Sequence, residues 1–172
     1  MQLEQLLKSL ELRNHAPTDQ WDPPYCGEIP LHIDEKGDWF YQNSRIKRQQ
    51  LVKLFASVLV QENGDFFLIT PAERVKISVA DAPFIVTEWK SVTAPESPVI
   101  QVTTNIGSQY PLSEDYPLLI KNAVPYVQLD HGLQAKVHRN VYYQWVEAAT
   151  IDPESDEVVL KSGTSRFILG QI

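Results

Sequence analysis

Apolar and polar residues alternate along 74–80, and this alternation predicts a strand with one buried face. Val75, Ile77 and Val79 fall on one side, while Arg74, Lys76 and Ser78 fall on the other. The same two-residue period predicts a hairpin at 31–41, with its turn at DEKG. Asn63-Gly64 lies between two further apolar runs and predicts a type I′ hairpin, because both turn residues must adopt positive φ. Most of the chain is therefore expected to form antiparallel sheet.

Helical spacing of apolar residues occurs in three places. Leu51, Leu54, Phe55 and Val58 predict a helix over about 46–57 that turns these residues toward the core, with Asn43 or Ser44 as its cap. The spacing of Leu3, Leu6, Leu7 and Leu10 predicts a short amphipathic helix over residues 2–12. A third helix is expected at 140–149.

The order of these elements recurs about 94 residues along the chain. Gly37, a hairpin strand, Arg45 and a helix compare with Gly132, a hairpin strand, Arg139 and a helix. We therefore predict an α+β protein with duplicated antiparallel-sheet-plus-helix units and an extra N-terminal helix. The expected domains are 1–90 and 91–172, and SVTAPESP at 91–98 is the candidate linker.

Composition limits the possible classes of protein. The 172 residues are 43% hydrophobic and carry a net charge of -7, which argues against a nucleic-acid-binding surface. One cysteine permits no internal disulfide, and the four histidines show no spacing typical of metal ligands. The first residues lack the apolar run of a signal peptide, and no stretch is long and apolar enough to span a membrane. We expect a cytoplasmic protein without a metal or cofactor.

The cations before the second helix are unusual for their position. Arg45, Lys47 and Arg48 cluster where the helix should begin, although cations are unfavourable at the positive end of a helix dipole. A bound anion would stabilise such an arrangement. The alternative is a solvated basic turn paired with acidic residues. His138 and Arg139 repeat the feature before the later helix.

Other residues allow a functional and a structural interpretation. Trp39 and Tyr41 share one face of the first hairpin, where they would either stack on a flat ligand or fill the core. Arg74 would line a groove or lie on an exposed sheet face. Glu73 and Asp81 would do acid–base chemistry if they converged, and would otherwise stabilise turns. No Walker loop or GxSxG motif is present.

Several segments together resemble the bacterial domain of unknown function family 1285. They are CGEIPL, GDWFYQNSRIKRQQLVKLFASVL, ITPAERVKISVADAPF, TTN and GLQAKVHRNVYY, and they span about residues 25–146. The resemblance implies two domains with a duplicated core, the second superficially similar to pleckstrin-homology-like folds. It also implies a nucleotide-like ligand between the domains and a role in signal transduction. Matching positions that would face such a site are Trp39, Arg48, Thr70, Glu73, Asp81, Asn105 and Arg139. One departure from the family's pattern is Asp130-His131, where relatives often carry a basic residue just before the equivalent of Gly132.

The sequence thus favours a non-catalytic ligand-binding or sensor protein over an enzyme. Arg45, Arg48 and Arg139 would supply charge to a nucleotide-like anion, and Trp39 or Tyr41 a stacking face. The alternative is a protein–protein interaction adaptor, which would expose a large apolar patch. A third class, a hydrolase using Glu73 and Asp81, requires these carboxylates to share one pocket.

Overall fold

The computed structural model describes residues 15–172, which form two units. One unit, called here the first unit, holds the described residues up to Phe84 together with Leu129–Gln134. The second unit holds Ile85–Gln128 and Ala135–Ile172. The chain thus returns to the first unit for six residues after most of that unit is complete.

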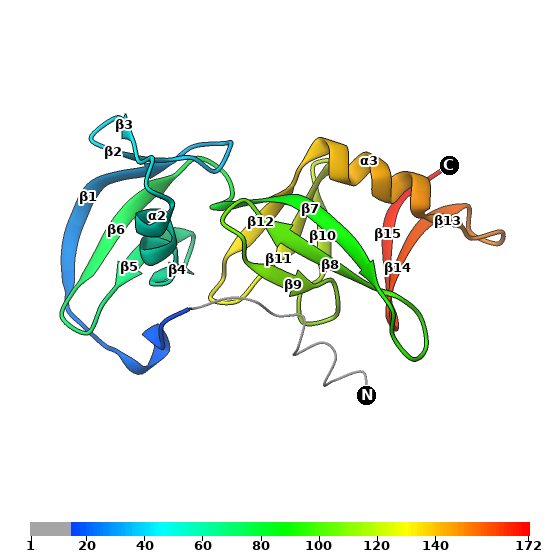
Figure 1. The fold of residues 1–172 in the computed structure, drawn as a ribbon, viewed down its shortest axis with the longest axis horizontal. Helices are drawn as coiled ribbons and strands as arrows, with labels where there is room; N and C mark the ends of the chain where they lie inside the picture. Colours follow the sequence, from blue (N-terminus) through cyan, green and yellow to red (C-terminus); the bar gives the residue numbers. More distant parts are fainter. Residues whose placement is uncertain (1–14) are drawn as a thin grey trace. The chain divides into compact units, whose positions relative to one another are not determined.

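The first unit is a six-stranded sheet with one α-helix (Figure 1). Its strand order is β3-β2-β1-β6-β5-β4, in which β1 and β6 are parallel and the other neighbours are antiparallel. The elements in chain order are η1 (Thr18–Gln20), β1 (Tyr25–Ile33), β2 (Trp39–Tyr41), β3 (Ser44–Arg45), α2 (Gln49–Ala56), β4 (Leu59–Glu62), β5 (Asp65–Ile69) and β6 (Arg74–Val79).

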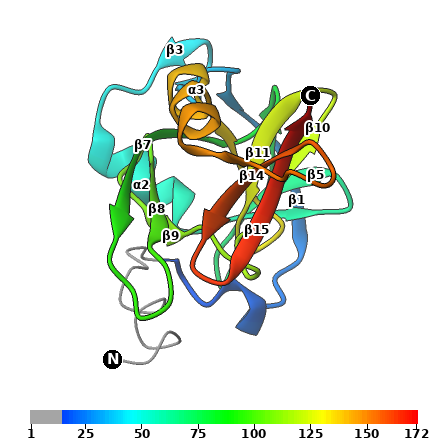
Figure 2. The ribbon, with the colours of Figure 1, turned by 90° about the vertical axis from the view of Figure 1, so that its right-hand side faces the viewer.

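The second unit combines a six-stranded sheet, a three-stranded sheet and a helix. The strand orders are β10-β11-β12-β7-β8-β9 and β13-β14-β15. Helix α3 lies against β14 (Figure 2). The elements are β7 (Phe84–Val92), β8 (Val99–Thr104), β9 (Gln109–Pro111), β10 (Leu118–Lys121), β11 (Val124–Gln128), β12 (Gln134–Val137), α3 (Arg139–Ala148), β13 (Thr150–Ile151), β14 (Glu157–Ser162) and β15 (Ser165–Gln171).

The predicted duplication is present, but its offset differs from the expected one. The two six-stranded sheets have the same strand order when β1–β6 are matched to β7–β12. The β4–β5 and β10–β11 turns then correspond, and Asn63 and Asn122 in them both adopt positive φ, 59 residues apart. The expected offset of about 94 residues is wrong, because it matched α2 to α3. Helix α2 precedes β4, whereas α3 follows β12.

The hairpins predicted from alternation are confirmed. Leu31–Ile33 pairs with Trp39–Tyr41, and Asn63-Gly64 turns between β4 and β5 with φ of 52° and 84°. Residues 91–98 do not form a linker, because β7 and β8 pair as neighbours and these residues form the end of β7 and the following turn. The predicted helix at 2–12 lies outside the described residues.

Helix α2 is shorter than predicted, and it buries a different face. It begins at Gln49 because Ser44 and Arg45 belong to β3. Its buried residues are Val52 and Ala56, whereas Leu54 is 61% exposed. Within residues 15–172, no helix has the length and apolar character needed to cross a membrane.

Candidate functional site

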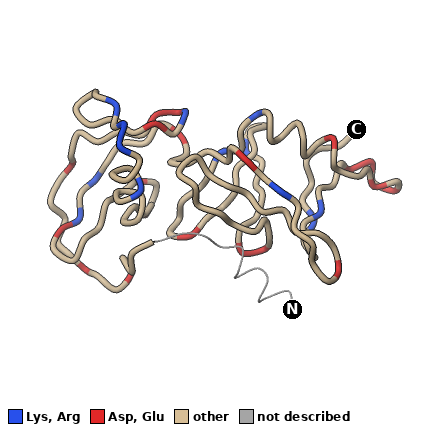
Figure 3. The backbone as a smooth tube through the Cα atoms, viewed as in Figure 1, with Lys and Arg blue, Asp and Glu red and all other residues tan. Residues whose placement is uncertain are grey.

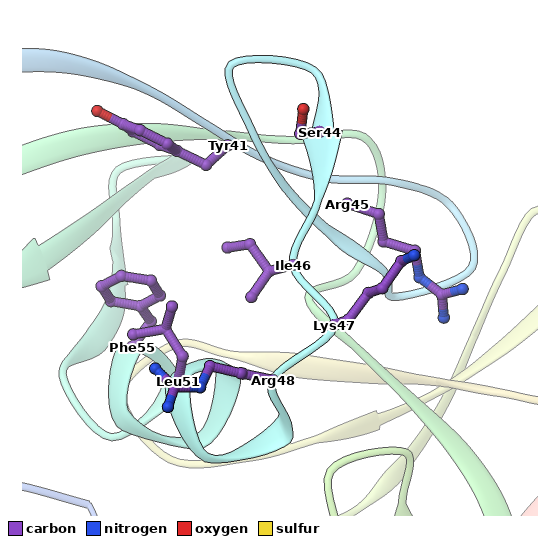
Figure 4. A pocket seen from close by; sticks show the side chains of 8 residues that line it. All are labelled: Tyr41, Ser44, Arg45, Ile46, Lys47, Arg48, Leu51 and Phe55. Carbon is purple, nitrogen blue, oxygen red and sulfur yellow. The ribbon is translucent and has the colours of Figure 1, made fainter.

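A cavity of about 580 Å³ opens between the β2–β3 hairpin and the first turns of α2 (Figure 4). Its volume lies within the range of sites that hold small molecules. The lining residues are Tyr41, Ser44, Arg45, Ile46, Lys47, Arg48, Leu51 and Phe55. All eight come from a single stretch of fifteen residues in the first unit.

A tight hairpin builds one wall of the cavity. Tyr41 and Ser44 pair across the two-residue turn Gln42-Asn43, whose residues adopt φ of 48° and 66°. The Gln42 N–H donates to Pro30 O at 2.9 Å, and the Ile46 N–H donates to Trp39 O at 2.8 Å. These backbone bonds fix Tyr41 and Ile46 relative to the sheet, so the wall is preformed.

The start of α2 forms the opposite side. Arg48 is the N-cap in an extended conformation, and no side chain caps this end of the helix. The first turn also contains no acidic residue. The positive end of the α2 dipole is therefore not compensated by a local carboxylate. The cations expected inside the first turn instead lie before it: Arg45 in β3, Lys47 in the connection and Arg48 at the cap position.

The charges around the cavity are unbalanced. Arg45 Nη2 lies 3.1 Å from Asp38 Oδ1 and forms an ion pair. Among the residues that the structure describes, Lys47 and Arg48 form no ion pair, and no Asp or Glu lines the cavity. Figure 3 shows this basic stretch leading into α2. In a chain of net charge -7, the cavity is a local region of positive charge.

Apolar side chains form the interior of the cavity. In Figure 4, Ile46, Leu51 and Phe55 converge on one region, and Arg48 reaches along the helix to the side of Leu51. Arg45 and Lys47 lie on the other side of Ile46 in the same view. The Phe55 ring stacks on Trp39, with 6.1 Å between the ring centroids and 17° between their planes.

Three of the ten candidate ligand-binding residues, Tyr41, Arg45 and Arg48, line this cavity. Tyr41 is 48% exposed, so its ring is accessible to a ligand. Trp39 is 2% exposed and belongs to the core. A ring buried to that extent has no free face for stacking, so the structural interpretation of Trp39 is correct.

Thr70 and Glu73 serve the turn between β5 and β6. The Thr70 hydroxyl accepts hydrogen bonds from the N–H groups of Ala72 and Glu73, at 3.3 and 3.1 Å. The Thr70 N–H donates to Glu73 O at 2.9 Å. These contacts account for both residues without a ligand.

The Arg74 side chain interacts with two residues of other strands in its sheet. It forms an ion pair with Glu62, and its guanidinium carbon lies 4.1 Å from the centroid of the Phe67 ring. Glu73 and Asp81 flank β6 at opposite ends, which places roughly 25 Å of extended chain between them. A hydrolase in which these two carboxylates share a pocket is therefore excluded.

Asn105 and Arg139 belong to the second unit. Asn105 Oδ1 accepts from the Ile85 N–H at 3.0 Å, and the Asn105 N–H donates to Ile85 O at 2.8 Å, so this residue holds the start of β7. Arg139 is exposed as the first residue of α3, where His138 caps the helix by accepting from the Asn140 N–H at 3.1 Å. Arg139 is thus not part of the cavity in the first unit.

The segment Leu129–Gln134 packs on β4, the edge strand of the first sheet. The Gln61 N–H donates to His131 O at 2.9 Å, and the His131 ring stacks on His15 with 3.7 Å between centroids. A Cβ at Gly132 would lie 2.6 Å from Gln61 O, so glycine allows this close approach. The Asp130-His131 departure therefore lies in a segment with a structural role.

Asp152 and Tyr142 have shifted pKa values, and both lie outside the cavity. The Glu154 N–H, which donates to Asp152 at 2.9 Å, is the main cause that lowers the pKa of Asp152, and nearby Arg166 adds to it. Burial raises the pKa of Tyr142. Both residues belong to the second unit, so neither indicates a catalytic group at the cavity.

Sequence reasoning missed the apolar part of the site. Leu51 and Phe55 were expected to lie in the core, and Ser44 was considered as a helix cap, yet all three line the cavity. A usable signal existed, because the helical apolar stripe at Leu51, Leu54 and Phe55 directly follows three cations.

Family models match nearly the whole chain. "Domain of unknown function (DUF1285), N-terminal domain" matches residues 16–82, and "Protein of unknown function (DUF1285), C-terminal domain" matches residues 83–169. The comparison with curated proteins found no match.

Two solved structures are similar to this one. A DUF1285 family protein from Silicibacter pomeroyi DSS-3 is 31% identical with a TM-score of 0.84, covering 97% of this chain and 93% of that one. A DUF1285 family protein from Shewanella baltica OS155 is 30% identical with a TM-score of 0.61, covering 71% of this chain and 94% of that one.

Proposed function

Because the chain belongs to the DUF1285 family, whose description states no function, we propose from the geometry of the cavity that the protein binds a small anionic molecule. One observation carries the proposal. Three cations line a cavity without an acidic residue, and two of them have no ion pair among the described residues. An anion there would neutralise Lys47 and Arg48 and would meet the positive end of α2.

The protein in this proposal acts as a sensor and not as a catalyst. Binding at Tyr41 and Arg48 would be read out in signal transduction, and the ligand would be nucleotide-like in charge. The same proposal includes a cytoplasmic location. It also includes a pleckstrin-homology-like character of the second unit, which superposition on such folds would test.

Arg48→Ser is the most informative variant for this function. It removes the cation and places a good capping residue at an uncapped helix start. We expect anion affinity to fall roughly ten- to hundredfold, because a charge-assisted hydrogen bond is lost. We also expect the variant to unfold no more easily than the parent, since the new cap contributes about 1 kcal/mol.

Isothermal titration calorimetry with inorganic phosphate, AMP and decanoate measures the affinity, and denaturant unfolding measures the stability. Arg139→Ser is the matched control, because it removes an exposed arginine at the other helix start, outside the cavity. If none of the three anions binds, or if Arg48→Ser binds them as the parent does, the proposed function is wrong.

An interaction adaptor is the second candidate, favoured by one observation on α3. Tyr143 is 59% exposed and Val146 is 42% exposed, and a spacing of three residues places them on the same face of the helix. Tyr143→Ser with Val146→Ser would weaken capture of a protein partner that is identified with the parent chain. A partner captured equally well by both chains would exclude this face as its binding surface.

A further inference from the structure

We propose that the ligand of this cavity is an amphipathic anion, with an unsubstituted apolar body and a single charged head, and not a nucleotide. The inference rests on the proposed function, since it specifies the ligand class of the same site. It follows from the kinds of side chain that line the cavity and from their arrangement.

The cavity offers few polar groups apart from its cations. Ser44 and Tyr41 are its uncharged polar side chains. In Figure 4, the Tyr41 hydroxyl points away from the region where Ile46, Leu51 and Phe55 converge. No Asp, Glu, Asn or Gln lines the cavity to accept hydrogen bonds from a ligand.

A nucleotide needs more side-chain acceptors than the Ser44 and Tyr41 hydroxyls that this cavity offers. Ribose hydroxyls and the exocyclic amino groups of bases are donors, and such groups lose affinity when they are desolvated without a partner. Cationic side chains donate hydrogen bonds and do not accept them. A base and a sugar placed against Ile46, Leu51 and Phe55 would therefore leave their donors unpaired.

An apolar body fits the same surface well. Ile46, Leu51 and Phe55 are only partly buried, so a hydrocarbon chain or plain aromatic ring would remove further apolar area from water. Tyr41 adds an accessible ring at the margin. These four side chains supply the apolar part of the lining, and Arg45, Lys47 and Arg48 supply the cationic part.

Arg48 is placed to bind the charged head of such a ligand. Its side chain extends along α2 to the side of Leu51, so its guanidinium lies at the border of the apolar region (Figure 4). It makes no ion pair among the described residues. A carboxylate on an apolar body seated against Leu51 and Phe55 would lie within reach of this guanidinium, which binds carboxylates in a bidentate manner. Charge complementarity and the apolar lining thus favour the same class of ligand.

The experiment compares decanoate, AMP and uncharged decanol by calorimetry on the full chain, at concentrations below micelle formation. We expect decanoate to bind at least tenfold more tightly than AMP. Decanol should bind more weakly than decanoate, because it lacks the charge that Arg48 recognises. Leu51→Asn should reduce decanoate affinity and leave the weaker AMP affinity nearly unchanged, whereas Arg48→Ser should reduce both.

An independent signal comes from the Trp39 indole. Phe55 lines the cavity and stacks on Trp39, so an apolar body that contacts Phe55 should shift the Trp39 indole N–H resonance. Trp39→Phe identifies that resonance among those of the four tryptophans. Leu54→Asn is the control, because it changes an exposed leucine of α2 that does not line the cavity.

The possible outcomes distinguish a wrong ligand class from a wrong proposed function. If AMP binds in an Arg48-dependent manner and decanoate does not, the ligand class is wrong and the proposed function stands. If decanoate binds equally well to the Leu51→Asn variant, its apolar body lies elsewhere and the inference fails. If neither decanoate nor AMP binds, the inference fails, and if inorganic phosphate does not bind either, the proposed function fails with it.

Discussion

Ala123 has a backbone conformation that its side chain opposes. It follows Asn122 in the β10–β11 turn with φ of +64°, where the Cβ of an L-residue meets the following carbonyl oxygen. We expect Ala123→Gly to raise the free energy of unfolding of the second unit by about 0.5–1 kcal/mol. Denaturant unfolding monitored by tryptophan fluorescence measures the change.

Ala94→Gly is the control for this prediction. Ala94 lies in the β7–β8 turn of the same unit and is not among the residues with positive φ. Glycine there should only increase the entropy of the unfolded chain and slightly lower stability. A gain at Ala94 equal to that at Ala123 would contradict the assignment of strain.

Asp152 makes the stability of the second unit depend on pH. Its pKa is lowered in the folded chain, first by the Glu154 N–H. The stabilisation is therefore present above the unfolded-state pKa and is lost as pH falls through the lower folded-state pKa. Asp152→Asn should destabilise the protein at neutral pH, and the difference from the parent should shrink in acid. Asp156→Asn is the control, because it changes an exposed carboxylate of the same loop that does not accept the Glu154 N–H, and it should show no such convergence.

At the residue scale, the charged part of the site was predictable and the apolar part was not. Arg45, Lys47 and Arg48 are close in the chain, so folding was not needed to bring their charges together. Leu51 and Phe55 line the cavity because the β2–β3 hairpin lies across from them and leaves them only partly buried. Periodicity identifies an apolar stripe, but it does not reveal whether that stripe is fully buried.

At the scale of elements, α2 shows why the position of a helix end is hard to predict. The stretch before it has no strong helix breaker, and Ser44 is a good capping residue type. Cross-strand pairing of Phe40 with Arg45 nevertheless extends the hairpin through Arg45 and delays the helix to Gln49. Cross-strand pairing in the β2–β3 hairpin thus overrode the preference for a helix start, while the turn at Asn63-Gly64 was predictable because its geometry depends on two adjacent residues.

The contact between Gly132 and β4 gives a prediction at this scale. Gly132→Ala should destabilise the first unit by about 1–3 kcal/mol more than Gly64→Ala does, because it adds overpacking against Gln61 O. Both glycines have positive φ, but a Cβ at Gly64 would meet nothing within 4 Å. Equal losses in denaturant unfolding of the two variants would show that Gln61 moves aside without cost.

At the scale of the whole molecule, the repeated strand order was only partly visible in the sequence. Two units were predictable from recurring turns and strands. The true offset was hidden, because β9 leads to β10 without a helix, whereas α2 precedes β4, and because α3 follows β12. Helices give the strongest periodic signals, so matching α2 to α3 was the natural but wrong alignment.

The return of Leu129–Gln134 to the first unit has a consequence for biosynthesis. The ribosome makes the chain from its N-terminus, so β1–β6 emerge long before the segment that covers β4. Until that segment emerges, the Gln61 N–H and the His15 ring lack their partners at His131. The first unit therefore reaches its final state only after most of the second has been translated, and a nascent chain halted before residue 129 should resist proteases less well than the released protein.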